Sequence, residues 1–352
     1  MKILKLITTV LVLILLSGCN LFNKSKSREK PDVSGIHLDV QLLRFDQDLC
    51  DFNTKDYQQQ LAAMQTKYGP FFNFYIEHFV IGPHPAGDST PVEHDAIMKF
   101  ISDSYIKGLQ DSINFHFKDA RDVEQDLAQS FKYYKYYFPK AMVPKVVAVN
   151  SAFALGAFTY DKDVLGIGLD LYMGPNNVDY DSAGIYKYLQ HKMRREYIAR
   201  NAMEVIYNLN FGAADMERGE TLIEGMVEKG KKMYFLSYIL PDAPDSLIVG
   251  YTDAQTKWCQ ANEYEIWKFL NDKDMLYKNN YMDQKRYLDE GPNTPGMPAG
   301  APGNIGSWIG LQIVNKFMKE TGHKISMADM ITGYDAKAIL KKAKYRPAKS
   351  VF

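Results

Sequence analysis

Residues that commonly bind metals are scarce in this chain. Its 352 residues include 7 histidines and 3 cysteines. No two histidines are three or four positions apart; they occupy positions 37, 78, 84, 94, 116, 191 and 323. A zinc-binding helix of the common peptidase type needs two histidines at that spacing, with a glutamate between them. The sequence lacks this motif and leaves open only a zinc site built from glutamates or from distant histidines.

Other familiar catalytic patterns are also missing. The chain has no Gly-x-Ser-x-Gly turn for a serine nucleophile, and no Gly-Lys-Ser/Thr or dinucleotide motif for phosphate. Asp161, Asp163 and Asp170 do not have the spacing of a calcium loop. Paired catalytic carboxylates cannot be found from spacing alone. We therefore predict no catalytic residue, cofactor or metal ligand at any position.

The chain also has no surplus of charge of either sign. Lysine and arginine number 42, and aspartate and glutamate number 42. No global field therefore favours nucleic acid as a partner. Hydrophobic residues make up 46% of the chain and charged residues 24%, which is typical of a packed globular protein. After the amino-terminal leader, no apolar run approaches the length of a transmembrane helix.

The amino terminus has the pattern of a bacterial lipoprotein leader. A basic start at Met1–Lys5 precedes an apolar run at Leu6–Leu16, which is short for a bilayer span. Leu16-Ser17-Gly18-Cys19 then resembles a lipobox, in which lipid is attached to the cysteine thiol. We predict a signal peptide at residues 1–18 and lipid attachment at Cys19. An ordinary secretory leader with a chance cysteine is the alternative.

The residues after the lipobox indicate how the protein is placed. Residues 19–31 are polar and basic and are expected to form a flexible tether, followed by one globular domain at 32–347. Asn20, where aspartate would signal retention in the inner membrane, favours the outer membrane, and the lack of an acidic cluster favours its periplasmic face. Cys50 and Cys259 are expected to be buried thiols, with a disulfide as the alternative in an exported protein.

The rest of the chain predicts an α+β fold that is mostly helical. We expect extended segments at 33–45, 145–150, 153–160, 164–171 and 247–252, with a hairpin turn at Tyr160–Asp163. We expect helices at 56–75, 95–112, 123–138, 185–209, 221–240, 253–269 and 305–319, a helical hairpin at 324–340, and loops at 82–91, 215–219 and 291–306. The strands should form a small mixed or antiparallel sheet on the long helix pair 185–209 and 221–240. Gly306 and Gly310, one turn apart, permit close approach of a neighbour.

The helix within Thr221–Asp242, which Pro241 ends, holds a glutamate of interest. Its apolar residues form one stripe, and Glu228 lies off that stripe. Thermolysin-like zinc peptidases carry their third metal ligand on such a helix, so the preceding helix should bring two histidines. It offers only His191, whose i+4 partner is Arg195. We therefore expect Glu228 to pair with Lys232 on a solvated face.

Two further stretches allow a functional or a structural interpretation. The aromatic run Tyr133–Phe138 could stack on sugars, but core packing at a helix end is the more common role. The loop 291–306 is rich in glycine and could cradle a phosphate, yet it lacks the residues of known phosphate loops. We expect both stretches to be structural.

Several segments together carry a family resemblance. They are the lipobox with its polar tether, HLDVQLLRFDQDL, VLGIGLDLYMG, TLIEGMVEKGKKMYFLSYILPD, YTDAQTKWC and APGNIGSWIGLQIVNKFM. They resemble the gliding-motility lipoprotein GldB family of Bacteroidetes, from the leader to Lys344–Pro347 and most specifically at the lipobox and Gly303–Met318. That family is similar to predicted thermolysin-like zinc peptidases, so the resemblance implies a degenerate peptidase fold. Glu228-Lys229-Gly230 departs from the peptidase pattern, in which glycine follows glutamate directly.

The resemblance implies a non-catalytic lipoprotein that supports gliding motility or the linked type IX secretion machinery. Its partners would be the membrane, through the lipid anchor, and proteins of that machinery, bound at a helix cleft or at the edge of the hairpin. The family offers no catalytic residues to transfer to this chain. A periplasmic zinc metallopeptidase is the alternative function, and glycan binding is a third.

The lipobox yields a direct prediction. Cys19→Ser should release the protein from membranes into the soluble fraction, because each buried acyl methylene contributes roughly 0.8 kcal/mol to anchoring. Fractionation with immunoblotting measures this, with Cys50→Ser as the control that should stay membrane-bound. Continued sedimentation of the Cys19→Ser variant with membranes would contradict lipidation at this residue.

Overall fold

The computed structural model describes residues 30–52, 55–82, 93–212 and 221–349. Val33–Phe352 form one compact unit, and Met1–Asp32 form a separate one. The lipobox and Cys19 lie outside the described residues. So do the turn expected at 215–219 and all but Gly82 of the loop expected at 82–91.

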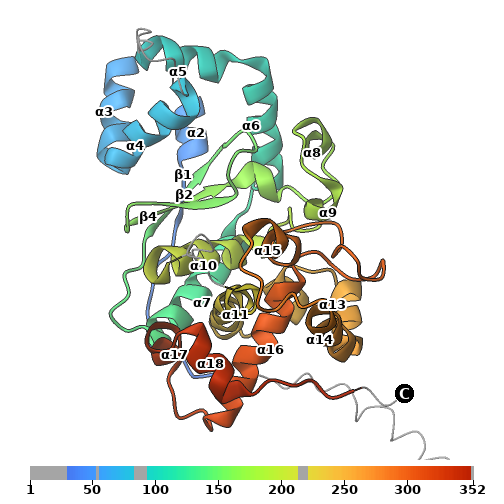
Figure 1. The fold of residues 1–352 in the computed structure, drawn as a ribbon. Coiled ribbons are helices and arrows are strands. Elements are labelled where there is room, and N and C mark those ends of the chain that lie inside the picture. Colours follow the sequence, from blue (N-terminus) through green and yellow to red (C-terminus); the bar gives the residue numbers. More distant parts are fainter. Residues whose placement is uncertain (1–29, 53–54, 83–92, 213–220, 350–352) are drawn as a thin grey trace, which may run out of the picture. The chain divides into compact units, whose positions relative to one another are not determined.

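A mixed four-stranded sheet lies in the compact unit (Figure 1). Its strands are β1 (Leu42–Arg44), β2 (Lys145–Val149), β3 (Ala157–Tyr160) and β4 (Val164–Gly168), in the order β1-β2-β4-β3. β1 and β4 both run parallel to β2, and β3 pairs antiparallel with β4. The predicted hairpin and mixed sheet are therefore confirmed. β2 and β4 are apolar along almost their whole length because helices cover both faces of the sheet.

Each face of the sheet belongs to its own hydrophobic core. Val147, Val149 and Val164 pack against a mainly aromatic core, whereas Val146, Leu165 and Ile167 pack into a larger core on the other face. Helices of the aromatic core are α2 (Phe45–Cys50), α3 (Tyr57–Tyr68), α4 (Pro70–Tyr75), the π-helix η2 (Ile76–Ile81) and α5 (Glu93–Ser102). The larger core includes α7 (Arg121–Tyr137), α10 (Glu196–Phe211), α11 (Leu222–Ile239) and α16 (Ile305–Glu320).

Shorter elements connect and cover these layers. In chain order, α6 (Ser104–His116) follows α5, and the 3₁₀ turn η3 (Leu169–Tyr172), α8 (Asp179–Ser182) and α9 (Lys187–Gln190) lie between β4 and α10. After α11 come α12 (Asp245–Val249), α13 (Asp253–Ala261), α14 (Glu263–Asp272), α15 (Tyr281–Leu288), α17 (Met327–Gly333) and α18 (Ala336–Ala343). The α+β, mostly helical fold class is thus confirmed.

The backbones of α11 and α16 touch where the two helices cross. A Cβ added to Gly310 would lie 1.7 Å from the carbonyl oxygen of Met226, and one added to Gly230 would lie 2.2 Å from the carbonyl carbon of Gly310. The close approach expected at Gly306 and Gly310 is therefore confirmed. α11 is buried on nearly every side, with 14 of its 18 residues buried, so the single apolar stripe expected for it is wrong.

The long helix expected at 185–209 is broken in two. α9 ends at Gln190, and α10 begins only at Glu196. Between them Arg194 forms an isolated antiparallel bridge with Met173, and the Gly174 N–H donates to the Met193 carbonyl at 2.8 Å. Pairing with a distant segment therefore draws the chain out of a helical path that its local sequence permits.

Other boundaries differ for local reasons. The helix expected at 56–75 is divided at Gly69, whose φ of +58° ends α3 before Pro70 begins α4. The helix at 95–112 is divided at Asp103, whose carboxylate accepts from the N–H groups of Tyr105 and Ile106 to cap α6. The segment expected at 253–269 is similarly two helices, α13 and α14, which meet at Asn262.

Of the segments expected to be extended, 153–160 and 164–171 are strands only at Ala157–Tyr160 and Val164–Gly168. Two others depart further from the expectation. Only Leu42–Arg44 of the segment 33–45 pairs with another strand, at residues 146–148 of β2. The segment 247–252 overlaps the helix α12, which ends at Gly250 in the left-handed conformation with φ of +77°. A short apolar run does not distinguish a buried strand from a buried helical turn, which explains the error at 247–252.

The structure bears on the expected state of two cysteines and on the search for membrane-spanning helices. Cys50 and Cys259 are both free thiols, and Cys259 is buried. The disulfide considered as an alternative is therefore not formed. Among residues 30–349, where described, no helix combines the length and apolarity needed to cross a bilayer.

The helix crossing yields a stability prediction. Gly310→Ala should lower the free energy of unfolding by about 3 kcal/mol or more, because its Cβ meets main-chain atoms that cannot rotate away. Gly108→Ala is the matched control: Gly108 lies within α6 with no atom within 4 Å of an added Cβ. That control should gain about 0.5–1 kcal/mol from helix propensity. Urea unfolding measures both, and equal stability of the two variants would contradict the crossing.

Candidate functional site

Charged side chains gather where α10 faces α11. Arg200 and Glu204 lie one turn apart on α10, and the Arg200 guanidinium donates to the Glu204 carboxylate. Lys232 approaches the same carboxylate from α11, with 2.8 Å between its Nζ and Oε1 of Glu204. Arg200 also donates to the Ile248 carbonyl of α12. We call Arg200, Glu204 and Lys232 the α10–α11 charge cluster; it links three helices through one carboxylate and two cations.

Glu228 pairs with a different lysine from the one expected. Its Oε1 lies 2.8 Å from Nζ of Lys231, whereas Lys232 turns toward Glu204 on α10. The expected pair of Glu228 with Lys232 is therefore wrong. The face is also less solvated than expected, because the side chain of Lys231 is only 5% exposed and that of Glu228 only 23%.

The electrostatics of the cluster favour a role in stabilising the fold over a role in proton transfer. Burial acts to raise the pKa of Glu204, but the charges of Arg200 and Lys232 outweigh it and hold that pKa well below its usual range. A carboxylate with so low a pKa is a poor general base near neutral pH. Burial lowers the pKa of Lys229, whose Nζ donates to the Leu288 carbonyl on α15. The positive charge of Lys232 also lowers the pKa of Lys229, whereas the carboxylates of Asp289, Glu290 and Glu204 raise it.

The helix pair does not bring imidazoles together. His191 lies before α10, and its ring nitrogens face the carbonyl oxygens of Tyr188 at 2.8 Å and Gly250 at 3.3 Å. Burial and the charge of Lys192 lower the pKa of His191, and its two carbonyl contacts oppose this shift. In the parts of the chain that the structure describes, no three His, Cys, Asp or Glu side chains are grouped closely enough to hold a metal ion.

A second polar site lies at the carboxyl ends of the parallel strands β2 and β4. Asp170 is fully buried after β4, and its carboxylate accepts from the Ser151 N–H at 2.9 Å, the Ser151 hydroxyl at 2.8 Å and the Phe153 N–H. Burial raises the pKa of Asp170, and these hydrogen bonds oppose the rise. Ala152 and Phe153 have φ of 50° and 65°, a strained conformation for residues with side chains. Asp170 therefore holds the β2–β3 connection in shape.

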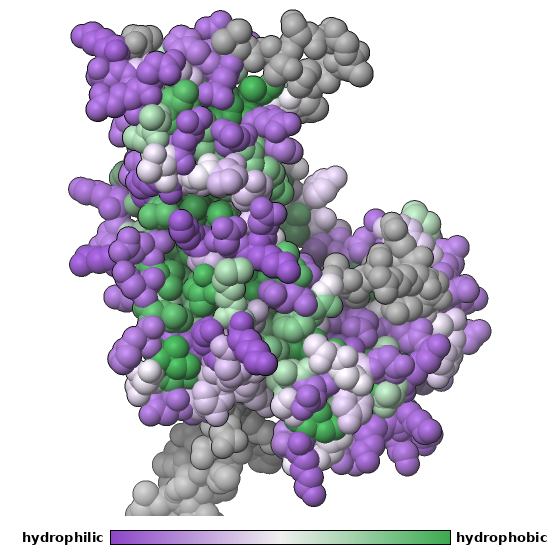
Figure 2. All heavy atoms as spheres, turned by 90° about the vertical axis from the view of Figure 1, so that its left-hand side faces the viewer, coloured by the Kyte–Doolittle hydropathy of each residue, from purple (hydrophilic) through white to green (hydrophobic). Residues whose placement is uncertain are grey.

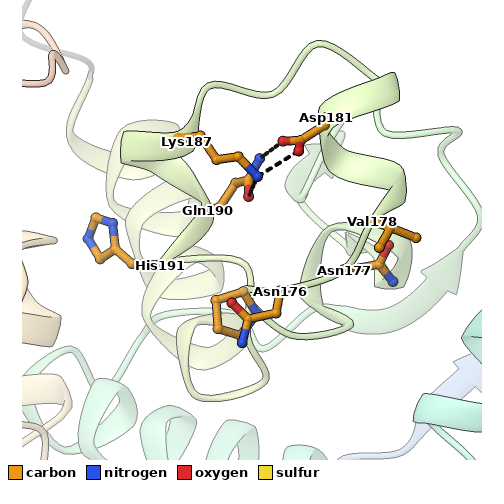
Figure 3. A pocket seen from close by; sticks show the side chains of 8 residues that line it. Asn176, Asn177, Val178, Asp181, Lys187, Gln190 and His191 are labelled. Atoms are coloured by element: carbon orange, nitrogen blue, oxygen red, sulfur yellow. Dashed lines mark hydrogen bonds and ion pairs between the residues drawn. The ribbon is translucent and has the colours of Figure 1, made fainter.

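An open polar pocket of about 420 Å³ lies beside α8 and α9 (Figure 3). Six of its eight lining residues are polar; the lining comprises Pro175, Asn176, Asn177, Val178, Asp181, Lys187, Gln190 and His191. Asp181 is 2.6 Å from Lys187, and the Gln190 amide donates to Asp181 at 2.8 Å. Because these groups largely satisfy one another, the pocket offers a small polar ligand few free hydrogen-bonding groups.

Parts of the two stretches with alternative interpretations pack inside the domain. Tyr133 and Tyr134 of the aromatic run are buried, and the ring centroid of Phe138 lies 5.9 Å from that of Phe235 on α11. In the glycine-rich loop, an added Cβ on Gly303 would lie 2.4 Å from the Gly291 carbonyl oxygen. The expectation that the aromatic run packs in the core is confirmed for these residues.

The sequence predicts only one of the two ion pairs in the charge cluster. The i,i+4 spacing of Arg200 and Glu204 can be read directly and indicates a helical ion pair. The contact with Lys232 joins residues 28 positions apart through the packing of two helices. No local pattern indicates it, because Glu228 occupies a better i,i+4 position for Lys232.

The cluster yields a prediction for stability and its pH dependence. Glu204→Gln should lower the free energy of unfolding at pH 7 by about 2 kcal/mol, less than for a fully buried pair because the Glu204 side chain is 25% exposed. The stability that ionised Glu204 contributes is present above the unfolded pKa of about 4.3 and lost as pH falls toward its lowered folded pKa. The difference between the two proteins should therefore shrink below about pH 4.3.

Chemical denaturation from pH 3 to 8 tests this prediction. Glu320→Gln is the control, because Glu320 forms an exposed i,i+4 pair with Lys316 and should change stability little. A Glu204→Gln protein as stable as the wild type at pH 7 would show that the cluster does not stabilise the fold.

Comparison with known proteins gives one match. The model of a family described as "Gliding motility protein GldB" matches residues 26–347. No curated protein and no solved structure matches the chain at a significant level.

Proposed function

Because the chain belongs to the gliding motility protein GldB family, we propose that it is a non-catalytic outer-membrane lipoprotein of the motility machinery. Membership of this family suggests involvement in gliding motility. The finer proposal is that lipid on Cys19 anchors the protein, residues 19–31 form the tether, and residues 32–347 form a domain facing the periplasm. Support for type IX protein secretion is part of the same proposal.

The α10–α11 charge cluster supports the non-catalytic part of the proposal. A zinc peptidase of the thermolysin type would place metal ligands on this helix pair, at i and i+4 of the first helix. On α10 one such i,i+4 pair is Arg200 and Glu204, and Lys232 faces Glu204 from α11. Two cations within contact distance of the only carboxylate in the cluster would repel a divalent metal ion. The domain would then act by binding proteins of the machinery.

The first experiment tests the role in cells. In a gliding bacterium that carries this chain, deleting it should abolish colony spreading, and the full-length chain should restore spreading. The Cys19→Ser chain should restore it poorly, because the domain is no longer held at the membrane, whereas Cys50→Ser should restore it fully. Normal spreading of the deletion strain would contradict a role in motility.

Metal analysis tests the non-catalytic part separately. The purified, untagged protein should contain far less than one zinc ion per chain. One tightly bound zinc per chain that is lost in Glu228→Ala would support a peptidase instead.

A further inference from the structure

Among the described residues, no hydrogen-bond partner is found for the main-chain groups at the outer edge of β3, and these groups follow a defined pattern. The Gly168 N–H donates to the Gly156 carbonyl at 2.9 Å, so these two residues form a hydrogen-bonded pair in the antiparallel ladder. Bonded and non-bonded pairs alternate along such a ladder, so Phe158 and Tyr160 also bond to β4. The N–H and C=O groups of Ala157 and Thr159 therefore point away from β4. Within the described residues, β4 is the only strand beside β3.

At the opposite edge of the sheet, a helix side chain bonds to the main chain of β1. There Glu124 of α7 accepts a hydrogen bond from the Leu42 N–H of β1 at 2.8 Å, which uses a main-chain donor at this edge. Natural proteins commonly block edge strands with charged side chains, proline or bulges, because an open edge recruits other strands. β3 reads Ala-Phe-Thr-Tyr and carries no charged side chain or proline, and its length of four residues limits the edge to two outward-facing residues.

An aromatic surface lies along one side of this open edge. Phe158 and Tyr160 project from β3 on the same side, and both are only half-buried. Phe79 of η2 lies 5.8 Å from Phe158, and Phe74 of α4 lies 4.7 Å from Tyr160, measured between ring centroids. Figure 2 shows the face of the molecule that lies to the left in Figure 1, where hydrophobic areas alternate with polar ones. We call these four residues the edge aromatic patch.

The hairpin tip adds charge at one end of the strand. Asp161, Lys162 and Asp163 follow β3 directly and are all exposed. The turn therefore carries one excess negative charge beside the last residue of the open edge. A segment that binds along β3 is favoured there if it presents a basic residue at that end.

From these observations we propose that β3 captures an extended segment of another protein, which adds to the sheet as a fifth strand. Only an extended main chain offers N–H and C=O groups at the spacing of Ala157 and Thr159. Apolar side chains on one side of the incoming strand contact the edge aromatic patch, and a basic residue lies near the Asp161–Asp163 turn. This inference rests on the proposed role as a partner-binding protein and identifies the surface and the kind of partner.

Photo-crosslinking in living cells identifies the partner and its contact surface. Leu155, 41% exposed just before β3, is replaced by p-benzoylphenylalanine in the full-length lipidated chain. Tyr277, 70% exposed between α14 and α15, receives the same replacement as the off-edge control. Irradiation should give a discrete adduct from position 155 and at least fivefold less from position 277. Mass spectrometry should locate the crosslink in a partner segment of alternating apolar residues.

Thr159→Pro and Thr159→Ala then test the main-chain contact. Proline removes the outward N–H of residue 159 and leaves the bonds to β4 in place, whereas alanine keeps that N–H. Thr159→Pro should reduce the adduct from position 155 at least tenfold, and Thr159→Ala should leave it unchanged. An equal adduct yield from the two variants would overturn strand addition, provided that both fold.

Hydrogen exchange on the unmodified chain covers the case in which the proline variant misfolds. The amides of Ala157 and Thr159 should exchange rapidly in the purified protein and at least tenfold more slowly in complexes isolated from cell envelopes. Unchanged exchange at both amides would overturn the inference. Adducts from position 277 without any from position 155 would refute partner binding at the edge of β3 and leave the partner-binding role intact. The absence of adducts at every exposed position tested would refute that role itself.

Discussion

Main-chain contact between α11 and α16 is the constraint on which the larger core depends. Gly230 and Gly310 lack side chains, so the two helices approach until backbone atoms meet. Helices that cross this closely fix each other's rotation, because any side chain at the crossing would separate them. α11 consequently lies within the core with apolar residues on almost every side, and its own Met226, Met233, Phe235 and Ile239 are all buried in the larger core.

The depth of α11 explains the charge cluster beside it. A buried helix that still carries Lys229, Lys231 and Lys232 must provide each ammonium group with a partner, because unpaired buried charge is very costly. Lys232 meets Glu204, Lys231 meets Glu228, and Lys229 reaches the Leu288 carbonyl. The burial of α11 therefore explains why each of these three lysines has a partner.

The sheet separates this charged, tightly packed half from an aromatic one. β2 and β4 have neighbours on both sides, whereas the two outer strands are treated differently: Glu124 bonds to β1, and β3 keeps its outward groups. Phe158 also covers Gly166 of β4, since a Cβ there would lie 2.3 Å from the Phe158 ring. The aromatic residues thus stabilise the hairpin and shape the surface beside its open edge.

Local pattern was sufficient for some features of this protein. The helical content, the hairpin at Tyr160–Asp163, the end of α11 before Pro241 and the close approach at Gly310 follow from periodicity, turn residues and side-chain size, which act over a few neighbouring positions. The lipobox and the family resemblance are likewise properties of the sequence alone. Three other features follow only from tertiary contacts. Arg194 leaves the helical path to pair with Met173, Lys232 pairs with Glu204 rather than with Glu228, and β3 lies at the edge of the sheet. Each of these depends on a partner far away in the chain, which no local pattern can identify.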